Sequence, residues 1–279
     1  MMPADPLSIT LLDLDAALGG GADLMVGGGF GLYLKQLHLE KSAVRTLLPK
    51  SRWPQARTTQ DIDLFLRAEI VADVARMERL RGALDQLGFL VEEDAKWMKF
   101  ARDVGRRTVI IDLMVGPLGE FEDRTERHSI RVKPIGSSGL HARAANDAIG
   151  VEHEPVRLSL GDGTRSSEVL VPQAFPFALM KLGALRDRVN DTNKDEGRHH
   201  ALDTYRIVAM LTEAEDDVAR MLAARYSAHP VITAAKRTVD ELFAAPNGLG
   251  GLRLREHPLC PADADPTWLA KELRRLVAG

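Results

Sequence analysis

Apolar residues follow two different periods along this chain, and the change of period divides it into two parts. Over the first 170 residues, short apolar or alternating runs predict strands at 23–26, 57–66, 89–91, 96–101, 108–115, 129–132, 156–160 and 168–171. Helical spacing interrupts them at 9–18, 32–39 and 70–87. From residue 172 it dominates, with helices predicted at 172–189, 194–211 and, after a Gly- and Pro-rich segment at 246–266, at 267–277. The pattern predicts an α+β fold, with a mixed β-sheet and flanking helices followed by a mostly helical part.

The segment 57–66, RTTQDIDLFL, places two carboxylates on one face of a predicted strand. Side chains alternate along an extended backbone, so Asp61 and Asp63 point one way while Ile62 and Leu64 point the other. Two carboxylates this close repel unless a cation or a proton lies between them. Mg²⁺ meets that need, because it takes oxygen ligands and carries substrate phosphates as further ligands. The plainer alternative is a strand end with two solvated acids.

A glycine turn precedes this segment in the chain. The strand predicted at 23–26 runs into Gly27-Gly28-Gly29-Phe30-Gly31, and helical spacing follows at once. Glycines there allow a phosphate close to the backbone, and the free N–H groups of a helix start attract anions. The alternative is a tight turn without a ligand, because the segment matches neither the Walker pattern nor Gly-x-Gly-x-x-Gly.

Asp112 is the one charged residue in the apolar run 108–115, TVIIDLMV. A buried carboxylate is costly unless it is paired or bound to a metal. One interpretation pairs it with Arg106 or Arg107. The other places Asp112 beside Asp61 and Asp63, where it completes a site of three carboxylates.

Basic residues gather in two places. The segment 41–56 contains five basic or aromatic residues around two prolines, and it is predicted to be a loop inserted between the glycine turn and the paired aspartates. A denser cluster follows in the helical part, formed by Lys181, Arg186, Arg188, Lys194 and Arg198. This cluster is interpreted either as a phosphate site or as a solvated helix pair with local ion pairs.

Several of these motifs, taken in order, resemble one family. They are Gly28-Gly29 at a strand-to-helix turn, Arg57-x-Thr59-x-Asp61-Ile62-Asp63, Asp112 in Ile-Asp-Leu, and Lys181-x-x-Ala184-x-x-x-Arg188 followed by Lys194-Asp195 and Asp203. Over roughly residues 23 to 210, the chain resembles the nucleotidyltransferase superfamily that includes DNA polymerase β, and within it the AbiEii-type toxin group.

The resemblance implies a nucleotidyltransferase catalytic domain at 1–170 and a helical C-terminal domain at 171–279. It implies catalytic roles for Asp61, Asp63, Asp112 and Lys181, with the three aspartates binding Mg²⁺ or Mn²⁺. It implies nucleotide-binding roles for Gly28, Gly29, Arg57, Thr59, Arg186, Arg188, Lys194 and Asp195, with Arg186 and Arg188 as alternatives for one phosphate contact.

The activity implied is transfer of a nucleoside monophosphate from a nucleoside triphosphate, such as ATP, to an RNA or a protein hydroxyl, with release of pyrophosphate. The RNA hydroxyl would be that of a tRNA 3′ end. The protein would be the toxin of a toxin–antitoxin pair, with a cognate antitoxin as partner. The alternative is a catalytically silent nucleotide-sensing or partner-binding module, against which the three intact aspartates argue.

Composition and charge indicate where the protein is found and which partners it has. The chain has 279 residues, 45% of them apolar, and a net charge of −3, so nothing in its overall charge indicates nucleic-acid binding. The single cysteine, Cys260, cannot form an internal disulfide, and acids stand where a signal peptide would have basic and apolar residues. We therefore expect a cytoplasmic protein without a membrane partner. We predict that Lys181→Ala stays folded with unchanged melting but transfers label much more slowly, with Lys35→Ala as a near-neutral control. If Lys181 is instead an ordinary surface residue, its substitution leaves both stability and catalysis unchanged.

Overall fold

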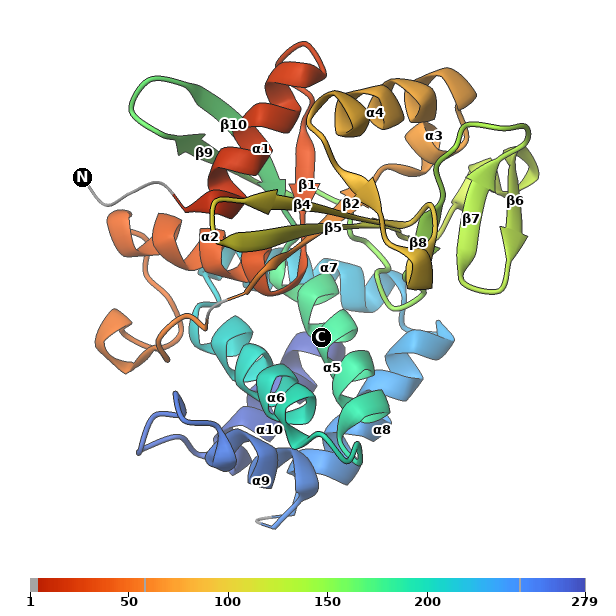
Figure 1. Ribbon diagram of the computed structural model, residues 1–279. Helices are drawn as coiled ribbons and strands as arrows, with labels where there is room; N and C mark the ends of the chain where they lie inside the picture. Colours follow the sequence, from red (N-terminus) through yellow and green to blue (C-terminus); the bar gives the residue numbers. More distant parts are fainter. Residues whose placement is uncertain (1–4, 58, 246, 279) are drawn as a thin grey trace. The chain divides into compact units, whose positions relative to one another are not determined.

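The chain forms two compact units. The computed structural model describes residues 5–57, 59–245 and 247–278 (Figure 1). One unit, the sheet unit, comprises Met1–Leu34, Thr58–Asn146 and Glu154–Pro172. The other, the helical unit, comprises Lys35–Arg57, Asp147–His153 and Gln173–Gly279. The division into 1–170 and 171–279 differs from these units in two segments, 35–57 and 147–153, that belong to the helical unit.

A ten-stranded mixed sheet occupies the sheet unit. Its strands are β1 (Leu24–Val26), β2 (Asp61–Leu66), β3 (Leu90–Val91), β4 (Lys99–Val104), β5 (Arg107–Val115), β6 (Thr125–His128), β7 (Arg131–Pro134), β8 (Ala142–Ala144), β9 (Val156–Gly161) and β10 (Ser166–Val171). The main order is β6-β7-β8-β5-β2-β1-β10-β9, and β3 and β4 extend from β5. The pairs β2–β5, β5–β8 and β1–β10 are parallel and the others antiparallel. The predicted α+β fold with a mixed sheet is confirmed.

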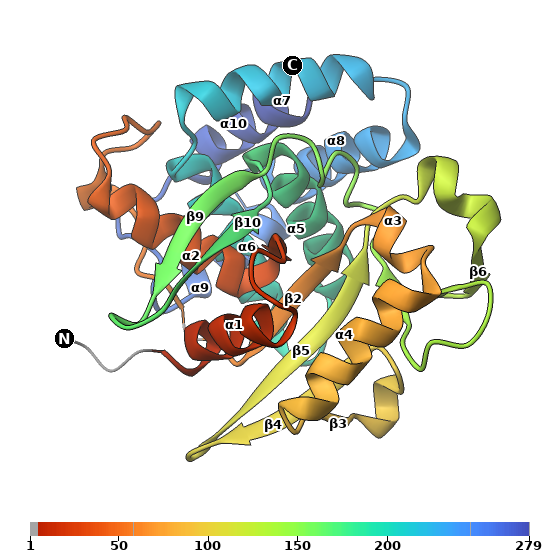
Figure 2. The same cartoon turned by 90° about the horizontal axis from the view of Figure 1, so that it is seen from above.

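The two central strands bury one face and leave the other partly open. In β5, Val109, Ile111 and Leu113 are buried, whereas the residues between them are partly exposed. The run 108–115 is therefore not apolar on two buried faces, as its sequence suggests. Helices α1 (Pro6–Ala17), α3 (Ala68–Val71) and α4 (Val74–Gln86) belong to this unit, and α1 and α4 lie beside β2 and β5 (Figure 2).

The helix predicted at 70–87 is in fact two helices. Asp73 has an extended backbone, and its side chain accepts a hydrogen bond from the Arg76 N–H at 3.1 Å, so it begins α4 as an N-cap. Apolar spacing continues across this break, which explains why periodicity alone predicts one helix. The chain also forms α2 (Gly28–Lys41) and the short 3₁₀ helices Lys50–Arg52, Glu93–Ala95 and Gly119–Arg124.

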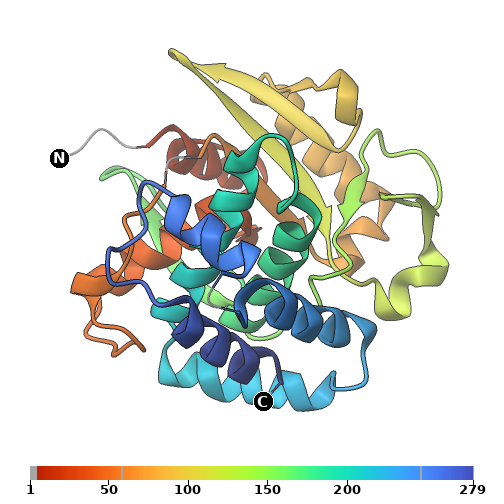
Figure 3. The same ribbon diagram turned by 90° about the horizontal axis from the view of Figure 1, so that it is seen from below.

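The helical unit contains α5 (Ala174–Arg188), α6 (Lys194–Ala209), α7 (Glu213–Arg225), α8 (Pro230–Phe243), α9 (Leu249–Glu256) and α10 (Pro266–Ala278) (Figure 3). Helix α5 contacts α6, α7, α8 and α10, and most of its side chains are buried. The Gly- and Pro-rich segment 246–266 contains α9 rather than loop alone. A Cβ atom on Gly250 would lie 2.9 Å from the Phe243 ring, so glycine allows α9 to pack closely there. None of the described helices combines the length and the apolar character needed to cross a bilayer.

The inserted segment 35–57 belongs to the helical unit through backbone hydrogen bonds. The N–H of Leu47 donates to the Leu211 carbonyl at 2.8 Å, and the N–H of Leu48 donates to the Ala209 carbonyl at 3.0 Å. The Trp53 indole is buried and donates to the Leu48 carbonyl. The two backbone hydrogen bonds to Leu211 and Ala209 join residues about 160 positions apart in sequence, which local patterns do not reveal.

Candidate functional site

Asp61, Asp63 and Asp112 lie on two neighbouring strands of the sheet unit. Strands β2 and β5 are parallel, with Asp63 directly opposite Asp112 and Asp61 opposite Ile110. Asp61 and Asp63 are both partly exposed, whereas Ile62 between them is fully buried, so the two carboxylates share the open face. The predicted neighbourhood of the three aspartates is confirmed, and their catalytic and metal-binding roles stay predictions.

Asp112 forms an ion pair with Arg143 on β8. The guanidinium Nε of Arg143 lies 3.4 Å from one carboxylate oxygen, and its Nη2 lies 3.3 Å from the other. The partner expected from sequence, Arg106 or Arg107, is wrong. Arg107 begins β5 and pairs in register with Val104, at the far end of the strand from Asp112.

Opposing influences act on the Asp112 carboxyl. Burial is the largest of them and raises its pKa above the ordinary value, and the nearby charge of Asp61 raises it further. Arg143 and then Lys99, which lies opposite Asp112 on β4, act in the other direction. The net result is a raised pKa, which makes Asp112 a better proton acceptor than an ordinary surface aspartate.

The glycine turn lies directly against Asp63. The N–H of Gly27 donates to the Asp63 carbonyl at 2.8 Å, and Gly28 has a φ of +58°. A Cβ atom on Gly28 would lie 1.6 Å from an Asp63 carboxylate oxygen. Gly28 is therefore required both by its left-handed backbone and by the close approach of Asp63. Gly29 follows in the first turn of α2 and is buried.

The loop before β2 also contributes to this end of the strand. Thr59 Oγ1 accepts a hydrogen bond from the Asp61 N–H at 3.4 Å. Strand β2 begins only at Asp61, so Arg57 and Thr59 precede it rather than forming part of a strand at 57–66. The Asp-x-Asp pair consequently lies at the entry of the strand, where the chain leaves the loop.

The oxygen donors of the sheet unit suit a hard divalent cation. Carboxylates of Asp61, Asp63 and Asp112 share one face of neighbouring strands, which is the ligand type that Mg²⁺ and Mn²⁺ prefer. Within the described parts of the chain, no three Asp, Glu, His or Cys side chains are already gathered around a common point. Asp112 would exchange its contact with Arg143 for the cation.

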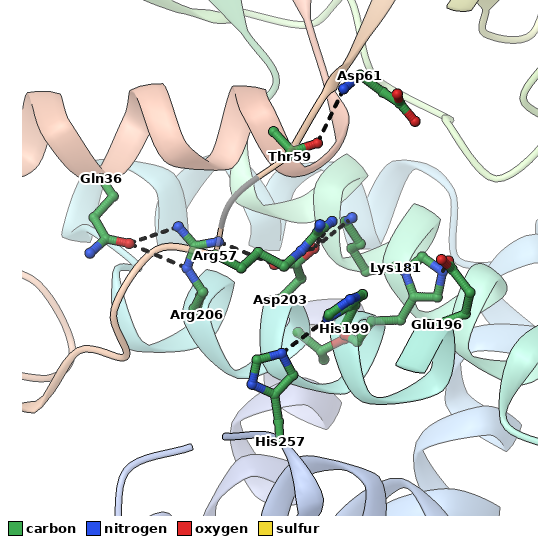
Figure 4. A network of polar contacts seen from close by, with 12 residues as sticks. Gln36, Arg57, Thr59, Asp61, Lys181, Glu196, His199, Asp203, Arg206 and His257 are labelled. Atoms are coloured by element: carbon green, nitrogen blue, oxygen red, sulfur yellow. Dashed lines mark hydrogen bonds and ion pairs between the residues drawn. The ribbon is translucent and has the colours of Figure 1, made fainter. Parts of the chain in front are cut away.

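A second polar cluster centres on Asp203 of α6 in the helical unit (Figure 4). The Asp203 side chain is completely buried. Lys181 Nζ lies 2.8 Å from its Oδ2, and Arg57 Nη2 lies 3.3 Å from the same oxygen. Arg206 Nη1 donates to the other oxygen at 3.1 Å, and Gln36 Oε1 accepts two hydrogen bonds from Arg206, at 2.7 and 3.2 Å.

Three cations therefore share one buried carboxylate. Burial by itself would raise the pKa of Asp203, but the charges of Lys181, Arg57 and Arg206 outweigh it and hold that pKa well below its usual range. Burial lowers the pKa of neighbouring His200 to about 3, and Lys181 contributes to this shift. His200 is therefore neutral at pH 7. The cluster carries an excess of positive charge that Asp203 alone does not balance.

The surface positions expected for Lys181 and Lys35 are wrong. Lys181 is 6% exposed, because it projects from α5 onto the buried Asp203. Lys35 is 2% exposed, and its Nζ lies 2.5 Å from a carboxylate oxygen of Glu215, which is itself buried. Neither substitution is a neutral surface change, and Lys35→Ala cannot serve as a control.

Four of the residues assigned to nucleotide binding lie at the α5–α6 connection, and three of them form local ion pairs. Arg186 pairs with Asp187, Arg188 pairs with Asp191, and Asp195 pairs with Arg198. Lys194 begins α6 and is exposed. The structure thus brings Lys181 and Arg57 together at Asp203 and leaves Arg186, Arg188, Lys194 and Asp195 out of that cluster. Their proposed roles stay predictions.

His199 has a partner that sequence spacing does not suggest. A histidine at this position, with acids one turn before and after it, is expected to be held by Asp195 and Asp203. Instead, its Nδ1 lies 3.0 Å from Nε2 of His257, which follows α9. Leu259 N–H donates to the other ring nitrogen of His257.

Three residues of these clusters were not predicted from the sequence: Gln36, Arg143 and Arg206. Arg206 had a usable signal, because it is a charged residue in the apolar stretch of α6 and follows Asp203 by three positions, within reach of an ion pair. Gln36 and Arg143 had none, since their partners are 170 and 31 positions away in the chain.

A scan against protein-family models, a search of curated proteins and a search of solved structures each found no match to this chain.

Proposed function

We propose that this protein is a metal-dependent nucleotidyltransferase. It transfers a nucleoside monophosphate from a nucleoside triphosphate to a hydroxyl group and releases pyrophosphate. One observation carries the proposal: Asp61, Asp63 and Asp112 occupy one face of two adjacent parallel strands, with the Gly28 turn packed against Asp63. Carboxylates in this arrangement are unfavourable without a cation, and they suit the chemistry of phosphoryl transfer.

The three aspartates have different parts in this proposal. Asp61 and Asp63 would hold Mg²⁺ or Mn²⁺, which when bound offsets negative charge on the phosphates. Asp112 takes the proton of the acceptor hydroxyl, a role that its raised pKa favours. The hydroxyl oxygen then forms a bond to the α-phosphorus as the bond to the pyrophosphate oxygen breaks.

The helical unit contributes positive charge. Lys181, Arg57 and Arg206 surround a single carboxylate, so the cluster attracts a further anion. A polyphosphate has the matching charge and accepts charge-assisted hydrogen bonds. The resemblance assigns Lys181 a catalytic role, which we keep as a proposal that does not depend on how the two units are arranged. Arg206 and Gln36 hold Asp203 in place.

The test is to incubate the protein with each α-labelled nucleoside triphosphate, total RNA and Mg²⁺, and to ask which macromolecule carries label. The proposal expects label on RNA, with a tRNA 3′ end as the leading acceptor, or on a protein hydroxyl. Label should disappear with a chelator and in the Asp63→Asn variant. Calorimetry should show Mg²⁺-dependent triphosphate binding that the same variant loses. Unchanged nucleotide binding in the presence of chelator would contradict the metal site.

A toxin–antitoxin role rests on this same activity. Expression of the wild-type chain should arrest growth, whereas expression of Asp63→Asn should not. A cognate antitoxin would be a protein that restores growth when co-expressed and that suppresses label transfer with purified components. Growth arrest by the Asp63→Asn variant would separate toxicity from catalysis.

The alternative is a catalytically silent module that senses a nucleotide or binds a partner. The ion pair between Arg143 and Asp112 favours it, because a guanidinium already neutralises one of the three carboxylates. This alternative predicts triphosphate binding without label transfer to any acceptor. It also predicts that Arg143→Gln changes nucleotide affinity but produces no turnover.

A further inference from the structure

The second dense basic region of the molecule lies in the sheet unit, around the β6–β7 hairpin and β8. Between residues 124 and 146 the chain has five Arg or Lys residues and one acid, Glu126, in a protein whose overall charge is −3. This basic region is separate in sequence from the cluster at 181–198. We use the term basic strip for Arg131, Lys133, His141 and Arg143, which lie on or next to β7 and β8.

The basic strip contains a like-charge pair that strand pairing alone does not favour. Arg131 on β7 lies directly opposite Arg143 on the antiparallel strand β8. Like charges directly opposite each other destabilise a sheet. Arg131 forms no ion pair with any residue that the structure describes. Glu126 pairs with Lys133 at 2.7 Å, so it does not offset the two arginines.

The basic strip lies on the same face of the sheet as the three aspartates. Met114 on β5 is the register partner of Arg143, and Asp112 precedes Met114 by two positions, so all three side chains point to one face. Arg131 shares this face through its pairing with Arg143. The Arg143–Asp112 ion pair joins the two groups directly. Positive charge thus extends from the edge of the sheet to Asp112.

The pKa of His141 is affected by the basic residues around it. Burial lowers its pKa, and the charges of Arg131, Lys133 and His128 lower it further. These three cationic or basic side chains therefore surround His141 from β6 and β7.

We propose that the basic strip binds the phosphodiester backbone of a nucleic-acid strand and that its terminal hydroxyl is the acceptor at Asp112. This inference rests on the proposed function, and it names the acceptor class that the three aspartates leave open. Regularly spaced cations along a strand suit a regular row of phosphates.

The residue types favour nucleic acid over an acidic protein. Four of the five cations between 124 and 146 are arginines, whose planar guanidinium groups bind phosphate in a bidentate manner and stack on bases. Ile130 and Ile135, at the two ends of β7, are 46% and 57% exposed, so apolar surface is available beside the cations for contact with unstacked bases.

The experiment measures binding by fluorescence anisotropy without nucleotide or added metal, using a labelled single-stranded RNA and a DNA of the same sequence. The test variant is Arg131→Gln/Lys133→Gln. Its matched control is Arg76→Gln/Arg79→Gln, the same loss of charge on α4. Both arginines line a pocket with Leu64, whose side chain points to the face of β2 opposite Asp63.

We expect the test variant to bind RNA at least about tenfold more weakly and the control to bind within about twofold of wild type. The slope of log affinity against log salt should fall by about 1.4, which is two phosphate contacts at about 0.7 each for a single strand. Arg131→Lys keeps the charge and should restore most of the binding. Circular dichroism and thermal melting will show whether each variant is folded.

Three outcomes would overturn the inference. The first is equal binding by the test variant and wild type, and the second is an equal loss in the control. The third is displacement of RNA by polyglutamate at equal charge concentration, which would indicate an acidic protein surface instead. Preference for the RNA or the DNA probe identifies the source of the strand. Nucleic-acid binding without label transfer would contradict the proposed function, and with it the acceptor assignment, but would leave the basic strip as a binding surface. Transfer with no such binding would contradict this inference alone.

Discussion

The two acidic centres of this protein are built in opposite ways. In the sheet unit, three carboxylates share one partly exposed face, and Arg143 and Lys99 are the cations that act on Asp112. In the helical unit, one fully buried carboxylate, Asp203, is held by three cations. The sheet centre gathers three acids on an open face, and the helical centre gathers three cations around one buried acid.

This difference separates two consequences of mutation. Asp203 is paired on both oxygens and completely buried, so its removal leaves uncompensated cations in a low-dielectric interior. Asp61 and Asp63 are partly exposed, so neutralising one of them leaves no partner charge stranded in a fully buried interior. Substitution of Asp203 should therefore destabilise the fold, whereas substitution of Asp61 or Asp63 should change ligand binding.

The largest effect is expected for Asp63→Asn on label transfer. A carboxylate that holds a catalytic cation contributes several kcal/mol to transition-state stabilisation, so the rate should fall on the order of a thousandfold. Thermal melting should change little, since Asp63 is partly exposed rather than fully buried. Initial rates with saturating triphosphate, together with a melting curve, check both statements. Wild-type transfer by this variant would remove the sheet centre from the mechanism.

Asp203→Asn should show the reverse pattern, with a large effect on stability. Breaking a buried ion pair by removing one partner costs about 3–5 kcal/mol. Urea denaturation, followed by circular dichroism, measures the change in unfolding free energy. Asp195→Asn is the matched control on the same helix, because the Asp195 side chain is 64% exposed and should cost no more than about 0.5 kcal/mol. Equal stability of the two variants would contradict the comparison.

Lys181→Ala should cost less than Asp203→Asn, because Arg57 and Arg206 still hold the carboxylate. We expect a loss of about 1–3 kcal/mol in unfolding free energy and a strong fall in label transfer. Arg237→Ala, on a side chain that is 67% exposed, is the control for both measurements. Transfer at the wild-type rate in folded Lys181→Ala would remove this residue from catalysis while leaving its structural role.

Gly28→Ala tests the contact between the glycine turn and Asp63. Gly105 is a suitable control, because its φ of +65° is similar and a Cβ there would meet no atom within 4 Å. Alanine at either position is strained by about 1–2 kcal/mol. The excess cost at Gly28 then measures the collision with the Asp63 carboxylate. That excess should shrink in an Asp63→Ala background, and its persistence there would exclude the contact as the cause.

The last prediction concerns pH. His200 has a pKa of about 3 in the folded protein, against about 6.5 when unfolded. The unfolded chain therefore binds the proton first as the pH falls, so stability is lost between about pH 6.5 and 3. His200→Gln should flatten part of this loss, measured as unfolding free energy at pH 7 and pH 4.5. His38→Gln, on an exposed residue, should leave it unchanged.

Local patterns in the sequence determined the elements that carry the site. Alternation around Asp61 and Asp63 placed both on one face because an extended backbone has a period of two. Apolar spacing located α5 and α6, which contain Lys181 and Asp203. The α+β class followed from the change of period near residue 172. Each of these features depends on neighbours within one or two turns.

Only the tertiary structure decided which charged groups meet. The pairing of Asp112 with Arg143 depends on β8 lying next to β5, and the Arg131–Arg143 pair depends on the register of β7 and β8. The burial of Lys181 and of Lys35 likewise comes from contacts with residues 22 and 180 positions away. A residue's charge is written in the sequence, but its partner and its exposure are set by strand register and helix packing, which bring distant positions together.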